Sequence, residues 1–283
     1  MPLNIPALLV PIQLSLFPRI IIPALVVHGM PTYLVIHFVI LTASRTVDFH
    51  ALRRAGYRGA VFDKDNCLTL PHKDTLVPEL QESWKSCKEA FGEGNVLIVS
   101  NSAGTHLDAG GIQAESVSHH LGVPVLSHKA MKPAYSCIAA IRDYFSSLSA
   151  PIQDNELIVV GDRVFTDLVL ANRMRMQSQR RRTKSSFLPS TRDAPTDSTE
   201  EKKEADPTPQ GPLSIWTKGV WERESMLMRS MEYGLISVME GLTAPPKGEF
   251  VNVGAFVKPI PLRKDAKPTG LTAFFRFMYK REI

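Results

Sequence analysis

The sequence has few cysteines, no long uninterrupted apolar run and no acidic residue near its start. Its 283 residues include three cysteines, Cys67, Cys87 and Cys137. Three cysteines cannot all pair with one another, so a disulfide scaffold is excluded and a reducing compartment fits best. The longest clean apolar run, residues 33–43, is about half of the roughly 20 residues that a membrane-spanning helix needs. The chain is 44% hydrophobic, which excludes a wholly disordered protein and predicts a globular one.

Residues 1–47 contain neither Asp nor Glu, and residues 20–43 are almost wholly apolar. Pro18 lies just before this apolar stretch, and Pro23 and Pro31 lie within it. Since proline breaks a helix, these residues argue against one long helix here. A secretory signal would begin with positive charge, which is missing here, and a mitochondrial presequence would hold more Arg and Ser. We therefore expect residues 1–56 to form an apolar N-terminal segment that directs the chain to an organelle, packs within the structure or lies at a membrane interface.

Charge is distributed unevenly along the chain. The net charge is +5, yet residues 63–176 carry ten basic and fourteen acidic side chains, whereas residues 1–62 carry five basic and one acidic. Residues 245–283 carry eight basic and three acidic side chains. Basic ends around an acidic middle do not suit a nucleic-acid-binding coat and favour an anionic surface such as a phospholipid membrane. We expect no nucleic-acid partner and infer no obligate protein partner.

Between residues 57 and 176, short β-branched runs alternate with helical stretches, which is the pattern of an α/β domain. Strands are predicted at residues 59–62, 95–99, 123–126 and 157–160, of which the third is the weakest. Helices are predicted at about residues 80–91, 112–121, 134–145 and 167–176. Trp84, Cys87 and Phe91 recur at helical spacing, so Cys87 should lie in the core. The predicted fold is a doubly wound, Rossmann-like parallel sheet with helices on both faces.

Residues 177–212 change character, with Arg180, Arg181 and Arg182 followed by Ser, Thr, Pro and mixed charge. This composition predicts a disordered insertion or linker, and a solvated loop is favoured over a nucleic-acid or localisation patch because no aromatic residue interleaves the Arg run. Residues 213–244 should complete the core with a strand at 213–216 and a helix at about 221–239. Residues 245–283 form a basic aromatic tail, which suits either a membrane interface or a packed helix.

Acidic and polar residues follow three of the predicted strands. They are Asp63 and Asp65, Ser100 and Asn101, and Asp162 and Asp167. One such residue would be an ordinary turn or cap residue, but in open α/β sheets ligands bind beyond the carboxyl ends of the strands. Three such clusters therefore predict a binding site at that edge.

Hydrolysis of a phosphate ester needs a nucleophile, a proton donor, a divalent cation and fixed donors around the phosphate. Asp63 and Asp65 lie two positions apart, so one can attack phosphorus while the other serves the leaving group. Carboxylate oxygens suit Mg²⁺, and Asp162 and Asp167 can complete such a site. Either Lys129 or Lys132 offers a compensating cation, and the proline that follows Lys132 favours Lys132.

Four segments resemble motifs I to IV of the haloacid dehalogenase (HAD) superfamily. They are Val61-Phe62-Asp63-Lys64-Asp65-Asn66-Cys67-Leu68-Thr69, Leu97-Ile98-Val99-Ser100-Asn101, Lys132-Pro133 and Val160-Gly161-Asp162-Arg163-Val164-Phe165-Thr166-Asp167. With the following Leu70-Pro71-His72-Lys73-Asp74, the chain resembles more narrowly the mitochondrial phosphatidylglycerophosphatase family of fungi and plants. The resemblance covers residues 57–176 and, weakly, 213–235.

This resemblance implies a role for each site residue. Asp63 would be the nucleophile that becomes an aspartyl-phosphate, Asp65 the acid and base, and Lys132 the group that steadies both nucleophile and intermediate. The phosphate would be held by Ser100 and Asn101. The metal set would be Asp63, Asp65 through its carbonyl, Asp162 and Asp167. Cys67 is expected to be a packed loop residue rather than a second nucleophile. His72 is expected either to contact a substrate phosphate or to be a loop residue without a functional role.

The family also implies a substrate and a location. Its members remove the terminal phosphate of phosphatidylglycerophosphate for cardiolipin synthesis, on the matrix side of the mitochondrial inner membrane. About thirty residues separate successive motifs, which leaves no room for a large cap domain, so the site should be open to a lipid headgroup. Two alternatives remain: a HAD phosphatase for a soluble phosphate ester or a phosphoprotein, and a non-catalytic membrane-associated scaffold.

Overall fold

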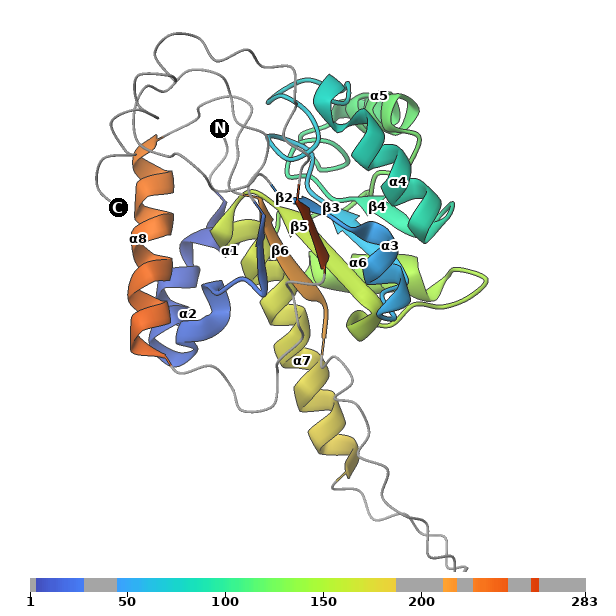
Figure 1. The fold of residues 1–283 in the computed structure, drawn as a ribbon. Helices are drawn as coiled ribbons and strands as arrows, with labels where there is room; N and C mark the ends of the chain where they lie inside the picture. The colour runs from blue at the N-terminus through green and yellow to red at the C-terminus, as the bar shows by residue number, and fades with distance from the viewer. Residues whose placement is uncertain (1–3, 28–44, 187–210, 218–225, 244–255, 260–283) are drawn as a thin grey trace, which may run out of the picture.

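The computed structural model describes residues 4–27, 45–186, 211–217, 226–243 and 256–259 (Figure 1). A five-stranded, all-parallel sheet lies at its centre, in the spatial order β1-β6-β5-β3-β4. The strands are β1 (Leu25–Val27), β3 (Gly59–Phe62), β4 (Val96–Ile98), β5 (Leu157–Gly161) and β6 (Leu213–Thr217). The predicted α/β, HAD-like fold class is confirmed.

Helices cover both faces of the sheet because successive side chains of each strand point to opposite faces. Phe62, Ile98 and Val160 pack on one face, against α3 (Phe49–Arg54), α4 (Gln81–Phe91) and α5 (Ile112–Leu121). Val61, Leu97 and Val159 pack on the other face, against α6 (Tyr135–Ser146) and α7 (Val169–Ser186). Strands buried on both faces are typical of parallel sheets.

The helix α4 follows the predicted spacing. Trp84, Cys87 and Phe91 are buried, and the Trp84 ring meets the Phe62 ring edge-on at a centroid distance of 5.2 Å. Cys87 therefore lies in the core, as expected. Cys67 is also buried in this cluster, and burial raises the pKa of its thiol well above the ordinary value. A protonated, packed thiol is a poor nucleophile, which agrees with the expectation of a packed residue.

The first part of the N-terminal segment packs against the α/β domain, so the boundary drawn at residue 56 does not separate two units of this fold. The helix α2 (Val10–Leu16) and the 3₁₀ turn η1 (Pro18–Ile21) bury Val10, Leu14 and Ile21 against α8 (Met226–Leu242), and β1 forms one edge of the main sheet. A short helix α1 (Ile5–Leu8) precedes them. Of the three alternatives left open for this segment, packing within the structure holds for residues 4–27, while residues 28–44 lie outside the described part.

The predicted linker at residues 177–212 also begins too early. Helix α7 continues to Ser186 after a π-helical turn, η5 (Val164–Leu168). Ser178 donates to the carboxylate of Asp154 at 2.6 Å, and Gln177 accepts from Arg142 at 2.5 Å, so long-range polar contacts hold this polar stretch in the helix. Arg180 and Arg181 are thus exposed helical residues rather than loop residues. Residues 187–210 lie outside the description.

The remaining elements give two further corrections. Residues 123–126 form an isolated bridge between Ile98 and Val125 rather than a full strand; Pro124 has no N–H to donate to a ladder. Part of the expected tail is packed: β7 (Val257–Pro259) pairs antiparallel with β2 (Arg45–Val47), and Phe256 is buried. The completion of the core by a strand and a helix within residues 213–244 is confirmed by β6 and α8. The aromatic cluster expected at residues 271–283 lies outside the described residues.

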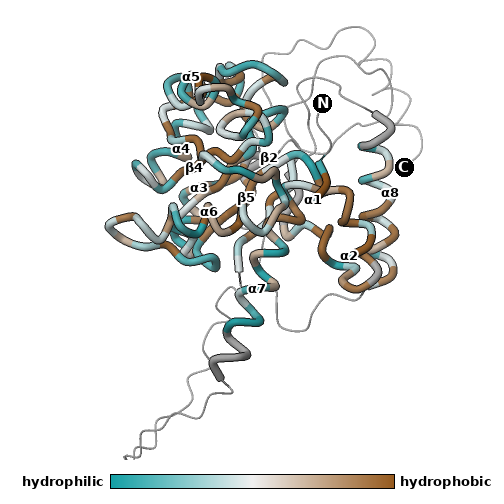
Figure 2. Tube along the Cα trace, turned by 180° about the vertical axis from the view of Figure 1, so that it is seen from behind, coloured by the Kyte–Doolittle hydropathy of each residue, from teal (hydrophilic) through white to brown (hydrophobic). Residues whose placement is uncertain are grey.

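Short 3₁₀ turns complete the described elements, namely η2 (Pro78–Leu80), η3 (Ala109–Gly111) and η4 (Asp154–Glu156). None of the helices within the described residues is both long enough and apolar enough to span a bilayer. Seen from behind, the tube of Figure 2 is hydrophobic over much of α2 and α8 as well as through the sheet.

Candidate active site at the carboxyl ends of the strands

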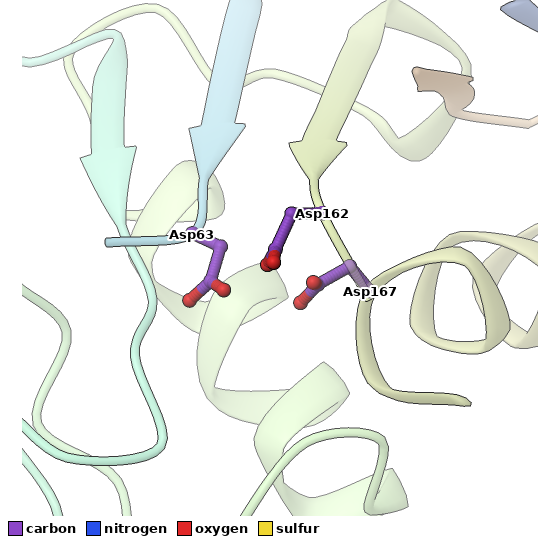
Figure 3. Close-up of side chains that lie close together, drawn as sticks. All are labelled: Asp63, Asp162 and Asp167. Carbon is purple, nitrogen blue, oxygen red and sulfur yellow. The ribbon is translucent and has the colours of Figure 1, made fainter. Parts of the chain in front are cut away.

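Three carboxylates meet where the central strands end. Asp63 follows β3 directly, Asp162 follows β5, and Asp167 lies in the π-helical turn that leads into α7. One oxygen from each side chain can be chosen so that all lie within 4.8 Å of one another, and Figure 3 shows the three side chains converging on one space. The prediction that neighbouring strand ends bring these residues together is confirmed for this trio.

Gly161 makes the close approach of Asp167 possible. A Cβ atom at this position would lie 2.4 Å from the side-chain atoms of Asp167, which is far inside van der Waals contact. Asp167 is fixed further by the Arg163 amide, which donates to its Oδ2 at 3.1 Å. Asp167 can therefore take this position only because residue 161, at the end of β5, has no side chain.

Lys132, and not Lys129, reaches the carboxylates. The buried ammonium of Lys132 donates to Oδ1 of Asp63 at 2.6 Å and to Oδ1 of Asp167 at 2.7 Å. Lys129 is exposed. Burial opposes the charge on Lys132, but Asp167 and Asp63 outweigh it and raise the pKa of the ammonium well above its usual value. Lys132 is thus a fixed positive charge beside Asp63.

Asp63 titrates in an unusual range. Burial and the neighbouring Asp167 raise the pKa of the Asp63 carboxyl to about 6, against the opposing effect of Lys132. A carboxylate whose ionised form is poorly solvated, and which sits beside a cation, is typical of functional sites.

Asp162 is paired with a residue that sequence reasoning missed. Arg229 of α8 donates to its Oδ2, and the Trp216 indole donates to its backbone carbonyl at 3.0 Å. The other carboxylate oxygen, Oδ1, is buried and has no hydrogen-bond partner among the described residues. Burial, Asp63 and Asp167 raise the pKa of Asp162 well above its ordinary value despite Arg229. No motif signals Arg229, because it lies 67 residues beyond Asp162.

Asp65 points elsewhere. Its Oδ1 accepts from the Lys64 ammonium at 2.6 Å and from the His72 amide at 3.0 Å, and its Oδ2 accepts from the Ser102 hydroxyl at 2.9 Å. Its carboxylate is therefore not one of the three clustered groups. Lys64 is fully buried and also donates to the carbonyl of Lys73.

Ser100 and Asn101 have different surroundings. The buried Ser100 hydroxyl lies 2.9 Å from that of Ser102 and accepts from the Ser102 amide, so the two serines link β4 to Asp65. Asn101 instead braces Lys132: its Oδ1 accepts from the Lys132 amide at 2.6 Å, and its Nδ2 donates to the Lys132 carbonyl at 3.4 Å. The Asn101 side chain is thus engaged with the lysine backbone, and the expected phosphate contact through the Asn101 backbone N–H stays a prediction.

The donor set at this site suits a hard divalent cation. Asp63, Asp162 and Asp167 contribute three negative charges, which Lys132 and Arg229 balance only in part, leaving a net charge of −1 for these five side chains when all are ionised. The buried, unpartnered Oδ1 of Asp162 is a ligand atom without a proton donor. Oxygen ligands of this kind, few in number and negatively charged, are those that Mg²⁺ takes in proteins.

Comparison with known proteins identifies the family. Residues 6–179 match the family model described as mitochondrial PGP phosphatase. The chain is 38% identical over 117 residues to a mitochondrial phosphatidylglycerophosphatase of Saccharomyces cerevisiae, 41% of this chain and 62% of that protein. It is 44% identical over 130 residues to the chloroplastic phosphatidylglycerophosphate phosphatase 1 of Chlamydomonas reinhardtii, 46% of each chain.

A third relative is the chloroplastic/mitochondrial phosphatidylglycerophosphate phosphatase 1 of Arabidopsis thaliana, which is 40% identical over 130 residues, 46% of this chain and 35% of that protein. The chain thus spans less than two thirds of the length of each of these relatives. No solved structure matches the chain. The family model covers more than half of the 283 residues, and the chain belongs to the mitochondrial PGP phosphatase family.

Proposed function

We propose that this protein hydrolyses the terminal phosphate monoester of phosphatidylglycerophosphate to give phosphatidylglycerol for cardiolipin synthesis. The observation that carries the proposal is the contact of Lys132 with Asp63: a carboxylate that is 11% exposed lies 2.6 Å from a buried ammonium, at the end of a central parallel strand. Family membership supplies the substrate class. The site geometry supports the chemistry, because it offers a carboxylate nucleophile that a neighbouring ammonium holds in place.

In the proposed reaction an oxygen of the Asp63 carboxylate attacks phosphorus, and the bond from phosphorus to the glycerol oxygen breaks. Asp65 donates a proton to that leaving oxygen, which departs as an alcohol. Asp65 then takes a proton from water, whose oxygen attacks the phosphorus of the aspartyl-phosphate; phosphate leaves and the Asp63 carboxylate is restored. The Ser102 hydroxyl, which donates to Asp65 and lies beside Ser100, links the acid to the phosphate-binding loop.

We propose Mg²⁺ as the cofactor, held by Asp63, Asp162 and Asp167 with the carbonyl of Asp65. When bound, the cation neutralises charge on the phosphate oxygens. The protein prepares for that charge in advance: Lys132 keeps Asp63 and Asp167 in place, and Arg229 holds one oxygen of Asp162.

Peripheral attachment to the matrix side of the mitochondrial inner membrane is part of this proposal. Support comes from α1, α2 and the residues that directly follow each of them, which expose large apolar side chains. The exposed residues are Ile5, Leu8, Leu9, Ile12, Leu16 and Phe17. No acidic residue lies among residues 1–47, and the guanidinium of Arg180 lies 5.5 Å from the centre of the Phe17 ring. An apolar helical face beside basic side chains suits the surface of an anionic bilayer.

The decisive experiment compares substrates and one variant. Full-length protein is assayed for phosphate release from phosphatidylglycerophosphate in vesicles and from water-soluble phosphate esters, with Mg²⁺. We expect turnover of the lipid, and a loss of at least about a thousandfold in Asp63→Asn. Preference for soluble esters or a phosphoprotein would favour a general HAD phosphatase. Absence of any turnover would favour a scaffold, and undiminished turnover by Asp63→Asn would exclude the proposed nucleophile.

A further inference from the structure

The N-terminal segment is connected to the loop that carries Lys132 by two side chains, one through a direct contact and one through Arg173. The first is Asn4, which precedes α1. Its Nδ2 donates to the backbone carbonyl of Lys132 at 2.8 Å, across 128 positions of sequence, while its Oδ1 accepts from the Ala7 amide at 3.2 Å and caps the helix. One side chain thus caps the start of α1 and also holds the main chain at Lys132.

The second contact runs through Arg173 of α7. The Gln13 side-chain oxygen, on α2, accepts from Nε and Nη2 of Arg173 at 3.1 and 2.6 Å. Nη1 of the same guanidinium donates to the carbonyl of Pro133, the residue after Lys132. Arg173 is 4% exposed and lies over the Tyr135 ring at 5.1 Å, so its position is fixed on several sides. Gln13 sets the plane of the guanidinium because it engages two of its three nitrogens.

These contacts act on the backbone of the lysine and not on its ammonium. Asn101, which follows β4, hydrogen-bonds to both the amide and the carbonyl of Lys132. Asn4, near the start of the chain, donates to the same carbonyl. The ammonium must stay within hydrogen-bond distance of both Asp63 and Asp167 while charge shifts during the reaction. A displacement of about 1 Å at a reacting centre costs up to about a hundredfold in rate.

We propose that Asn4 and Gln13 are positioning residues of the catalytic site, which hold the main chain at Lys132 and Pro133 so that the lysine keeps Asp63 in its attacking orientation. The inference rests on the proposed function. It gives residues 4–16, for which the sequence left targeting, packing and membrane contact open, a role in holding the site in place. Fixed rotamers and outer hydrogen bonds are what keep a catalytic group in productive geometry.

The test separates positioning from folding by variants that differ in one contact. Asn4→Ser keeps an oxygen to cap α1 but is too short to reach the Lys132 carbonyl. Gln13→Met removes the acceptor for Arg173, whereas Gln13→Glu retains it and serves as the rescue. Gln81→Met, at the exposed first residue of α4, is the matched control. Each full-length variant is assayed on a water-soluble phosphate ester with Mg²⁺, well below its melting temperature.

We expect kcat to fall by about tenfold or more in Asn4→Ser and in Gln13→Met, with KM nearly unchanged. Gln13→Glu and Gln81→Met should keep wild-type kcat, and all melting temperatures should lie within about 4 °C of wild type. Wild-type kcat in both Asn4→Ser and Gln13→Met would overturn the inference. A fall of kcat in Gln13→Glu equal to that in Gln13→Met would also overturn it. Failure of the proposed function is recognised separately in the wild-type protein, which would then release no phosphate from phosphatidylglycerophosphate or from any other ester, or would prefer soluble esters to the lipid.

Discussion

Arg229 holds Oδ2 of Asp162 and thereby joins helix α8 to the end of strand β5. Both side chains are buried, and the second oxygen of Asp162 is left without a hydrogen-bond partner among the described residues. A buried carboxylate is tolerated only when it is paired or binds a cation. The contact therefore stabilises the site before any metal binds, and it leaves one oxygen of Asp162 directed to the cluster.

Removal of this arginine should destabilise the protein. In chelator, Arg229→Met should lower the free energy of unfolding by about 3 kcal/mol or more, because Asp162 would be left buried without its cation. The control is Arg58→Met, which breaks the partly exposed pair of Arg58 with Glu156 and should cost less than about 1 kcal/mol. Denaturant titration measures the free energy of unfolding of both variants. Equal losses would show that the buried pair of Arg229 with Asp162 contributes no more stability than the partly exposed pair.

Asp63 should make the metal-free protein less stable as pH rises. Its pKa is raised from 3.8 to about 6 by burial and Asp167, so between these values the folded state binds more protons than the unfolded state. Stability conferred by this group is therefore greatest below about pH 4 and is lost as pH rises through 6. The melting temperature of wild type, measured in chelator relative to Asp63→Asn, should fall between pH 4 and pH 7. A difference that stays constant over this range would contradict the raised pKa.

Protons and Mg²⁺ should compete for the same carboxylates. Since the cation binds ionised oxygens and the pKa of Asp63 is about 6, calorimetry should show Mg²⁺ affinity weaker by at least about fourfold at pH 5.5 than at pH 7.5. Chelator should abolish turnover and added Mg²⁺ should restore it. Turnover that persists in excess chelator would argue against a metal-assisted site.

The exposed apolar face of α2 should govern vesicle binding. Ile12→Asp combined with Leu16→Asp places two charges where the side chains are 65% and 71% exposed, so folding should be little affected. Binding to anionic vesicles in a flotation assay should fall by about tenfold or more, with turnover of a soluble ester retained. The control is Ile112→Asp on α5, which is 72% exposed. Equal binding by all three proteins would remove α2 from the membrane surface.

Local patterns predicted the centre of the fold and most of the site. Runs such as residues 157–160 are apolar on both faces, which is typical of buried parallel strands, and the aspartates that follow them meet because parallel strands end at one edge. In the sequence, only the following proline favoured Lys132 over Lys129. In the structure Lys132 contacts Asp63 and Asp167, whereas Lys129 is exposed. The glycine at position 161 is a further local indication of the site, because a side chain there would collide with Asp167.

Long-range packing could not be read in the same way. Residues 25–27 form an edge strand within a continuous apolar stretch whose periodicity does not distinguish strand, helix and membrane segment. The polar sequence at residues 177–186 is typical of a linker, yet Asp154 and Arg142 hold its first turn in α7. Arg229, Asn4 and Gln13 carry no motif, because each acts on a residue that is distant in the chain.

The amino-acid sequence by itself determined the order of strands and helices around Asp63, the residue types of the carboxylate cluster and the family to which the chain belongs. The tertiary structure alone decided that the N-terminal helices pack beside the Lys132 loop and that α8 delivers Arg229 to Asp162. The physical reason is the range of the interactions: strand burial and turn chemistry depend on neighbours in sequence, whereas a hydrogen bond between residues 128 positions apart exists only once the chain has packed.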